Sequence, residues 1–166
     1  AVLVTGITAM LGPGPQRAAV TFLERAGGLK AVDPNLRKGL WGSDRPVELI
    51  TPLLARCDVV LAGESELRVF ADGDGPALAG ACAALGAREV VVKRGAVGVA
   101  ALDARGRWHV HEGTPADEVD PVGAGDAFNA AYLAARIEGA EVPEALEAGA
   151  SAGARAAASL GDTGRL

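Results

Sequence analysis

Up to Arg88, short apolar runs alternate with longer stretches that carry apolar residues on one helical face. Short apolar runs predict buried strands, and apolar positions spaced three or four apart predict helices. We expect strands at residues 1–5, 30–33 and 58–62, and helices at residues 15–26, 45–56, 64–70 and 76–85. An alternation of strands and helices is typical of a parallel sheet covered by helices on both faces.

Beyond Arg88 the pattern changes to strand-like runs with little sequence between them. The runs lie at residues 89–93, 98–102 and 108–111. Residues 103–106, Asp-Ala-Arg-Gly, have the composition of a hairpin turn, which favours antiparallel pairing. Helices are then expected at residues 124–138 and 143–159. We therefore predict an α/β protein whose sheet is mostly parallel and has an antiparallel edge.

The composition limits the core and excludes several kinds of partner. Hydrophobic residues make up 49% of the 166 residues but aromatic residues only 4%, so Ala, Val and Leu must form the core. A net charge of −5 offers no basic face for nucleic acid. No apolar run approaches the ~20 residues that cross a bilayer, and no signal segment opens the chain. These features predict a cytoplasmic protein with neither nucleic-acid nor membrane partners.

The two cysteines, Cys57 and Cys82, are isolated in the sequence and form no metal-binding spacing. Small buried apolar residues in a reducing compartment are the expected interpretation, ahead of a zinc ligand or a disulfide.

Residues 120–128 contain the most informative chemistry, because a glycine-rich loop there leads into a long apolar helix. Glycines let the backbone approach a ligand closely, and the first amides of a helix have no partner within it. Together these features predict an anion site. Asp126 would compete with a bound phosphate for those amides, but it makes sense if it faces an acceptor hydroxyl. A carboxylate there can take the proton that a hydroxyl loses when it attacks a phosphoryl group.

The stretch Asp-Pro-Val-Gly-Ala-Gly-Asp-Ala-Phe at residues 120–128 resembles a signature of the ribokinase (PfkB) family of carbohydrate kinases, Asp-Thr-x-Gly-Ala-Gly-Asp-x-Phe. It departs at Pro121, which lacks the hydroxyl and amide hydrogen of the usual Thr. The resemblance implies that Asp126 is the catalytic base and that Asp120 belongs to the nucleotide side of the site. The implied anion hole consists of Gly123, Ala124 and Gly125.

A second motif, Lys-Arg-Gly-Ala-Val-Gly at residues 93–98, follows a predicted strand. It resembles the family's Lys-x-Gly-x-x-Gly turn, which lies beside the nucleotide. The resemblance implies cofactor-binding roles for Lys93, Gly95 and Gly98, and a plain hairpin turn is the alternative.

A third motif, Asp-Pro-Asn-Leu-Arg-Lys-Gly-Leu-Trp at residues 33–41, lies at the end of a strand, where open α/β sheets bind ligands. It is similar to the Asp-x-Asn-x-Arg-x-x-Leu-Trp pattern of the ketodeoxygluconate kinase and fructokinase branches. Asn35 and Arg37 are the implied substrate-binding residues, since arginine can hold a carboxylate with two parallel hydrogen bonds. In the alternative, Asn35 caps backbone and Arg37 is solvated.

Two weaker resemblances concern cations. Gly-Glu-Ser-Glu at residues 63–66 replaces the family's Asn-x-x-Glu element, with glycine in place of asparagine, and implies that Glu66 acts on Mg²⁺. A surface carboxylate at a helix start is the alternative. Residues 151–154 and 161–162 are similar to the helix and turn that flank the family's adenine pocket and its site for a monovalent cation such as K⁺; small residues there also suit tight helix packing.

The resemblance spans nearly the whole chain but corresponds to the later half of a family member. The chain begins inside an apolar run without an initiator Met. We expect a ribokinase-like three-layer αβα sandwich truncated at its N-terminus, with residues 1–166 forming a single nucleotide-binding domain that lacks the substrate and lid region. Kinase activity of this chain alone should then be feeble or nil. Homo-oligomerisation could cover the exposed sheet edge.

Three interpretations follow. In the first, the chain is part of an ATP-dependent and Mg²⁺-dependent kinase that converts 2-keto-3-deoxygluconate to its 6-phosphate, with a fructokinase or ribokinase type still open. In the second, it is a non-catalytic nucleotide-binding fragment of such a kinase. In the third, it is an assembly module that uses only the fold.

Overall fold

The computed structural model describes residues 1–37, 46–113 and 119–159. Within these ranges six strands form one mixed sheet in chain order. The strands are β1 (Val2–Thr5), β2 (Lys30–Asp33), β3 (Val59–Gly63), β4 (Glu89–Lys93), β5 (Gly98–Leu102) and β6 (Trp108–Glu112). The first four strands pair in parallel, and the far edge is antiparallel. The predicted α/β class and mixed sheet are therefore confirmed.

The helices also follow the sequence pattern closely. They are α1 (Gly6–Met10), α2 (Pro13–Arg25), α3 (Pro46–Leu54), α4 (Glu64–Leu67), α5 (Gly75–Ala83), α6 (Ala124–Ile137) and α7 (Val142–Ala157). The pattern did not predict α1 or the short 3₁₀ helix Gly95–Val97, because segments of that length carry no helical periodicity. Residues 38–41 and 161–162, which belong to the predicted motifs, lie outside the described residues.

The chain divides into two compact units, which we describe separately. Unit 1 comprises Ala1–Lys93 and Ala101–Trp108, and unit 2 comprises Arg94–Ala100 and His109–Leu166.

The core of unit 1 is built on strands that are buried along almost their whole length. Four consecutive residues of β3, from Val59 to Ala62, are 2% exposed or less, as expected for a parallel sheet covered on both faces. Leucines and an isoleucine from α3 and α5 complete this core: Ile50, Leu53, Leu54 and Leu78. The aliphatic, ring-poor core expected from the composition is therefore confirmed for this unit.

Both cysteines belong to this core. Cys57 and Cys82 are free and buried, as the sequence predicted. Burial raises the pKa of each thiol from 9.0 to about 12, because a thiolate would lose its hydration there. Both side chains therefore pack as neutral apolar groups at neutral pH.

The carboxyl edge of the sheet in unit 1 is closely packed. A Cβ atom added to Gly6, which follows β1, would lie 2.1 Å from the carbonyl oxygen of Pro34, which follows β2. Only glycine lets these two backbone segments approach so closely. Gly6 therefore helps to hold in place the turn that the sequence assigned to the substrate.

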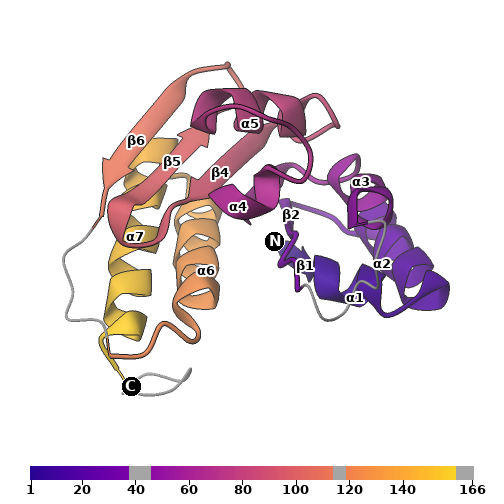
Figure 1. The fold of residues 1–166 in the computed structure, drawn as a ribbon, viewed down its shortest axis with the longest axis horizontal. Coiled ribbons are helices and arrows are strands. Elements are labelled where there is room, and N and C mark those ends of the chain that lie inside the picture. Colours follow the sequence, from indigo (N-terminus) through magenta and orange to yellow (C-terminus); the bar gives the residue numbers. More distant parts are fainter. Residues whose placement is uncertain (38–45, 114–118, 160–166) are drawn as a thin grey trace. The chain divides into compact units, whose positions relative to one another are not determined.

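In unit 2, helices α6 and α7 lie side by side (Figure 1). Phe128 of α6 stacks on Tyr132 with ring centroids 5.9 Å apart, and its ring covers Gly149 of α7. A Cβ atom at Gly153 would lie 3.1 Å from the carbonyl oxygen of Ala124. The small residues of α7 thus let the start of α6 pack tightly against it.

This packing predicts opposite effects of alanine at two helical glycines. A Cβ atom at Gly149 would lie 2.7 Å from the Phe128 ring, whereas one at Gly80 of α5 would meet nothing within 4 Å. Gly149→Ala should therefore destabilise the fold by about 1–3 kcal/mol through overpacking. Gly80→Ala should stabilise it by roughly 0.5–1 kcal/mol, because alanine is the better helix former. Urea unfolding followed by circular dichroism measures both changes, and a stabilised Gly149→Ala variant would contradict the packing.

Candidate active site

A buried ion pair lies at the carboxyl ends of the parallel strands of unit 1. Asp33, the last residue of β2, is 4% exposed. Its Oδ2 accepts a hydrogen bond from Nζ of Lys93, the last residue of β4, at 2.9 Å. Because β3 lies between β2 and β4 in the sheet, this bond spans the end of the intervening strand. The pair therefore ties two strands that do not pair with each other.

The same carboxylate also fixes the turn that follows β2. Oδ1 of Asp33 accepts a hydrogen bond from the amide of Asn35 at 2.9 Å. Asn35 has a φ of 40°, the left-handed region, which asparagine tolerates better than most residues. The chain then reaches Arg37, whose side chain is exposed. The two predicted substrate-binding residues thus lie on a turn held by the buried Asp33.

Glu66 holds this turn from the other side. Its Oε1 accepts a hydrogen bond from the amide of Leu36 at 2.6 Å, and its Oε2 accepts one from the amide of Gly63 at 2.7 Å. Glu66 therefore joins the start of α4 to the turn after β2. Each oxygen keeps a further lone pair, since an ionised carboxylate offers about four acceptor sites. The predicted Mg²⁺ role of Glu66 remains a prediction beside this structural role.

The turn between β4 and β5 opens unit 2. The amide of Arg94 donates to the carbonyl of Gly98 at 2.9 Å, which closes the turn. Gly95 has a φ of 58°, and open space surrounds the position of its missing side chain. A Cβ atom at Gly98, by contrast, would lie 2.3 Å from the carbonyl oxygen of His111 on β6. Strand packing thus explains Gly98 on its own, while Gly95 leaves room for a ligand.

The loop before α6 is anchored on the end of α7. The amides of Val119 and Asp120 donate to the carbonyl of Ala157 at 2.8 and 3.0 Å. Asp120 Oδ1 then accepts a hydrogen bond from the amide of Val122 at 3.0 Å. Gly123 ends the loop with a φ of 80° and occupies the N-cap position of α6. Since left-handed backbone favours glycine, this loop geometry explains why Gly123 stands at that position.

The first turn of α6 offers hydrogen-bond donors next to an exposed carboxylate. The amide of Ala124 donates to the carbonyl of Pro121 at 3.2 Å, and no side chain caps the helix. Among the described residues, the amides of Gly125 and Asp126 have no hydrogen-bond partner. The Asp126 side chain is exposed. The arrangement can bind an anion on the helix terminus and can present a base beside it.

The predicted site residues fall into two groups, one in each unit. The group in unit 1 is Asn35, Arg37, Glu66 and Lys93, and the group in unit 2 is Gly95, Gly98, Asp120, Gly123, Ala124, Gly125 and Asp126. Hydrogen bonds within unit 1 bring the first group to one edge of the sheet, and the loop before α6 collects most of the second.

Two features of these groups were absent from the predicted site. The sequence motif contained Asp33, but nothing in it indicated that this carboxylate is buried and pairs with Lys93. The Nε atom of Arg94 is buried and has no hydrogen-bond partner among the described residues. A buried donor without a partner is unusual in native proteins, so it is a candidate for contact with a ligand.

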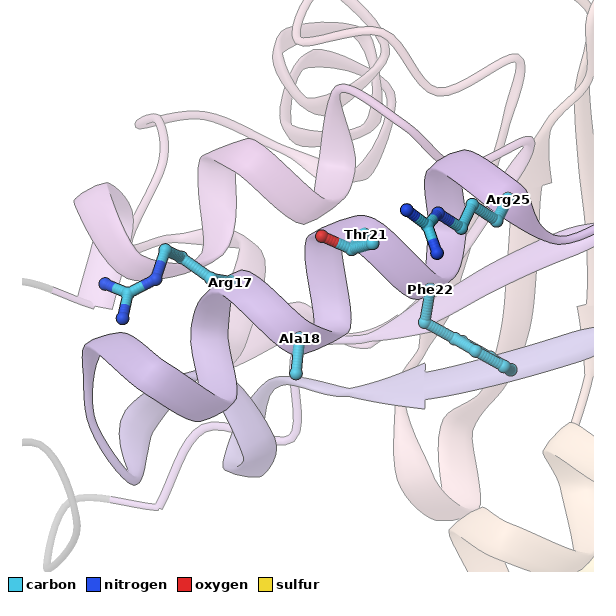
Figure 2. A pocket seen from close by; sticks show the side chains of 5 residues that line it. All are labelled: Arg17, Ala18, Thr21, Phe22 and Arg25. Carbon is cyan, nitrogen blue, oxygen red and sulfur yellow. The ribbon is translucent and has the colours of Figure 1, made fainter.

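A hollow elsewhere on unit 1 does not coincide with either group. It has a volume of about 580 Å³ and is lined by Arg17, Ala18, Thr21, Phe22 and Arg25. All five side chains come from α2 (Figure 2), so the hollow is a feature of one helix surface. No predicted site residue lines it.

The described ranges contain neither a helix that could span a bilayer nor a cluster of metal-ligating side chains. No helix there has the length and apolar character needed to cross a bilayer. No group of three or more His, Cys, Asp or Glu residues in those ranges is arranged to hold a metal ion. A Mg²⁺ site of the kind that uses one or two carboxylates together with substrate phosphates needs no such group.

Two curated proteins are similar to this chain over part of their length. A 2-dehydro-3-deoxygalactonokinase of Haloferax volcanii is 33% identical over 156 residues, which cover 90% of this chain and 49% of that protein. A fructokinase of Klebsiella pneumoniae is 36% identical over 122 residues, covering 70% of this chain and 39% of that protein. The chain therefore spans about half the length of these relatives, or less.

A solved structure matches the fold closely. A proposed ribokinase II of E. coli, solved in complex with ATP and Mg²⁺, superposes with a TM-score of 0.83 at 28% identity, covering 96% of this chain and 53% of that chain. The family model described as pfkB family carbohydrate kinase matches residues 2–165. Because that match takes in nearly the whole sequence and the glycine-rich loop with Asp126, this chain belongs to the PfkB family of carbohydrate kinases.

Proposed function

We propose that this chain carries the nucleotide-binding and catalytic part of an ATP-dependent kinase that phosphorylates 2-keto-3-deoxygluconate on its 6-hydroxyl. The observation that supports this most strongly is the first turn of α6, where an exposed Asp126 stands beside amides that have no partner among the described residues. The H. volcanii relative is named for a 2-dehydro-3-deoxy sugar acid, which belongs to the same chemical class.

Asp126 acts as the general base in this proposal. An exposed carboxylate can approach the hydroxyl of an incoming sugar to hydrogen-bond distance and accept its proton as the oxygen attacks. Gly123 sets the direction of the first helical turn, and the contact of Gly153 with Ala124 holds that turn against α7. The position of the base is thus fixed by backbone packing, as rapid proton transfer requires.

The amides of Gly125 and Asp126 stabilise the negative charge that develops on the transferred group. Fixed donors at a helix terminus need no reorganisation during the reaction, which makes them effective there. The amide of Ala124 contributes less than the resemblance implies, because it already donates to Pro121. The anion hole therefore consists mainly of the next two amides along the helix.

The residues present also fit a nucleotide and Mg²⁺. The buried Nε atom of Arg94 is a donor without a partner among the described residues, and the space beside Gly95 lets a phosphate approach the turn. Glu66 would hold Mg²⁺ directly or through water, using the lone pairs that its amide contacts leave. A bound Mg²⁺ would supply positive charge to the phosphates. The E. coli neighbour was solved with ATP and Mg²⁺.

Arg37 and Asn35 select the sugar acid. The exposed guanidinium of Arg37 can hold a carboxylate with two hydrogen bonds, and the turn that carries it is fixed by Asp33 and Glu66. Fructose has no carboxylate, so it would gain nothing from this contact. Fructose is the second candidate substrate, because the K. pneumoniae relative is a fructokinase.

Replacing the base should lower turnover without weakening nucleotide binding. In a coupled phosphorylation assay with 2-keto-3-deoxygluconate, sensitive enough to record the feeble turnover expected of this chain alone, Asp126→Asn should lower that turnover by a factor of about 10²–10⁴, which is the usual contribution of a general base. Calorimetry should give the same affinity for Mg·ATP in both proteins. Glu147→Gln, which removes an exposed carboxylate from α7, is the matched control and should leave both quantities unchanged.

The other outcomes separate the alternatives. Equal turnover of Asp126→Asn and the unmodified chain would contradict the assignment of the base. Binding of Mg·ATP with no turnover of any sugar would favour a non-catalytic nucleotide-binding fragment. No heat with Mg·ATP would contradict both nucleotide interpretations and favour an assembly module.

Arg37→Lys tests the substrate class. Lysine keeps the charge but cannot form two parallel hydrogen bonds to a carboxylate. The KM for 2-keto-3-deoxygluconate should rise roughly 10-fold to 100-fold, the range expected for a lost hydrogen bond to a charged group, while the KM for fructose should not change. Arg25→Lys on the exposed surface of α2 is the control. An equal rise for both sugars would mean that Arg37 supports the turn and does not bind the carboxylate.

A further inference from the structure

We propose that Asp33 is a positioning residue that transmits occupancy of the nucleotide site to the substrate-binding turn. The inference rests on the proposed function and extends it to Asp33, a residue of the third sequence motif to which neither the motif nor the anion site gives a role. Its basis is that the two oxygens of one buried carboxylate serve two different segments. Oδ2 accepts from Nζ of Lys93, and Oδ1 accepts from the amide of Asn35, each at 2.9 Å.

These two segments are the ones to which the proposed function gives different ligands. Lys93 ends β4 and is followed directly by the turn of Arg94 and Gly95, which we assign to the nucleotide. Asn35 begins the turn assigned to the sugar acid. They are 58 positions apart in sequence, and Asp33 connects them through two hydrogen bonds. The link is therefore a short, continuous chain of contacts.

The ion pair between Asp33 and Lys93 is largely shielded from water. The Asp33 side chain is 6% exposed and the Lys93 side chain 19%. A charge in such a site requires its partner, because water cannot replace the lost interaction. A change in the position of the Lys93 ammonium group should therefore also move the Asp33 carboxylate.

A bound nucleotide offers the Lys93 ammonium group another anion to which it can donate hydrogen bonds. The ammonium group sits on a flexible stem and can turn between acceptors. In the structure it is directed at Asp33, and the phosphates of a nucleotide beside Gly95 would compete for it. A ligand shifts an equilibrium only when it interacts differently with the two states, and this competition provides the difference.

A shift of Lys93 from Asp33 to phosphate should affect Asn35 much more than the rest of the turn. When Lys93 turns toward phosphate, the carboxylate of Asp33 loses the bond to its Nζ atom, and the bond from the Asn35 amide shortens or reorients. Leu36 is held independently by Glu66 at 2.6 Å. The expected response is thus a local rotation at Asn35, whose φ of 40° is already unusual, with the following residue held in place. By linkage, the sugar acid must affect nucleotide binding in the same sense.

The experiment records backbone amide spectra of the ¹⁵N-labelled chain while AMP-PNP and Mg²⁺ are added. The Gly95 amide reports whether the nucleotide binds at the proposed turn, and the Asn35 amide reports whether occupancy reaches the substrate-binding turn. In the unmodified chain we expect both signals to move with the same midpoint. In the double variant Asp33→Asn/Lys93→Met we expect Gly95 to move and the response of Asn35 to be lost.

The double variant should keep the fold. Removing one partner would leave a buried charge, whereas replacing both removes the charges together and is often neutral. Asparagine also retains an oxygen that can accept from the Asn35 amide. Its urea midpoint should therefore lie closer to that of the unmodified chain than the midpoint of either single variant. Lys30→Met, at the opposite end of β2, removes an equal charge and should leave both responses intact.

The outcomes distinguish this inference from the proposed function. If Gly95 moves in the unmodified chain and Asn35 does not, the nucleotide site stands and the transmission is wrong. If Asn35 moves equally in the double variant, the nucleotide acts on it directly and Asp33 is not the link. If neither amide moves, the proposed nucleotide site is wrong and the inference fails with it.

Discussion

The buried carboxylate of Asp33 is the constraint on which the carboxyl edge of the sheet depends. A charge this far from water must be met by fixed donors, and Lys93 and the Asn35 amide meet it. These donors come from a strand two places away and from the turn that follows β2 itself. The alignment of β2 with β4 and the geometry of the turn after β2 therefore both depend on the Asp33 carboxylate. Glu66 repeats the arrangement beside it, with each oxygen bonded to a backbone amide.

Unit 2 contains the complementary arrangement at the start of α6, where two amides have no acceptor among the described residues. Helix α5 begins in the usual way, with Asp74 accepting a hydrogen bond from the amide of Ala77 at 3.1 Å. Helix α6 has at its N-cap position Gly123, which has no side chain to do the same. A capping side chain typically contributes about 1 kcal/mol. An uncapped first turn gives up that stability and keeps its amides available, which supports the proposal that an anion binds there.

The sequence predicted what depends on neighbouring residues and missed what depends on strand order. Strands β2, β4 and β5 have the predicted ends, because apolar runs and turn residues lie next to each other in the chain. The Asp33–Lys93 bond joins residues 60 positions apart and exists only because β2, β3 and β4 are adjacent. Gly98 is similar, since its close approach to β6 depends on the folded hairpin. Gly123 could be anticipated because its loop and helix are contiguous.

The buried pair of unit 1 lies directly before the point where the chain passes to unit 2. Unit 1 ends its main segment at Lys93, and unit 2 begins at Arg94. The peptide bond between them joins a residue held by Asp33 to a turn whose Arg94 has a buried donor without a partner among the described residues. A kinase must bind its two substrates in a coordinated way, or it wastes nucleotide on water. Under the proposed function, Asp33 thus fixes the residue that directly precedes the nucleotide-binding turn.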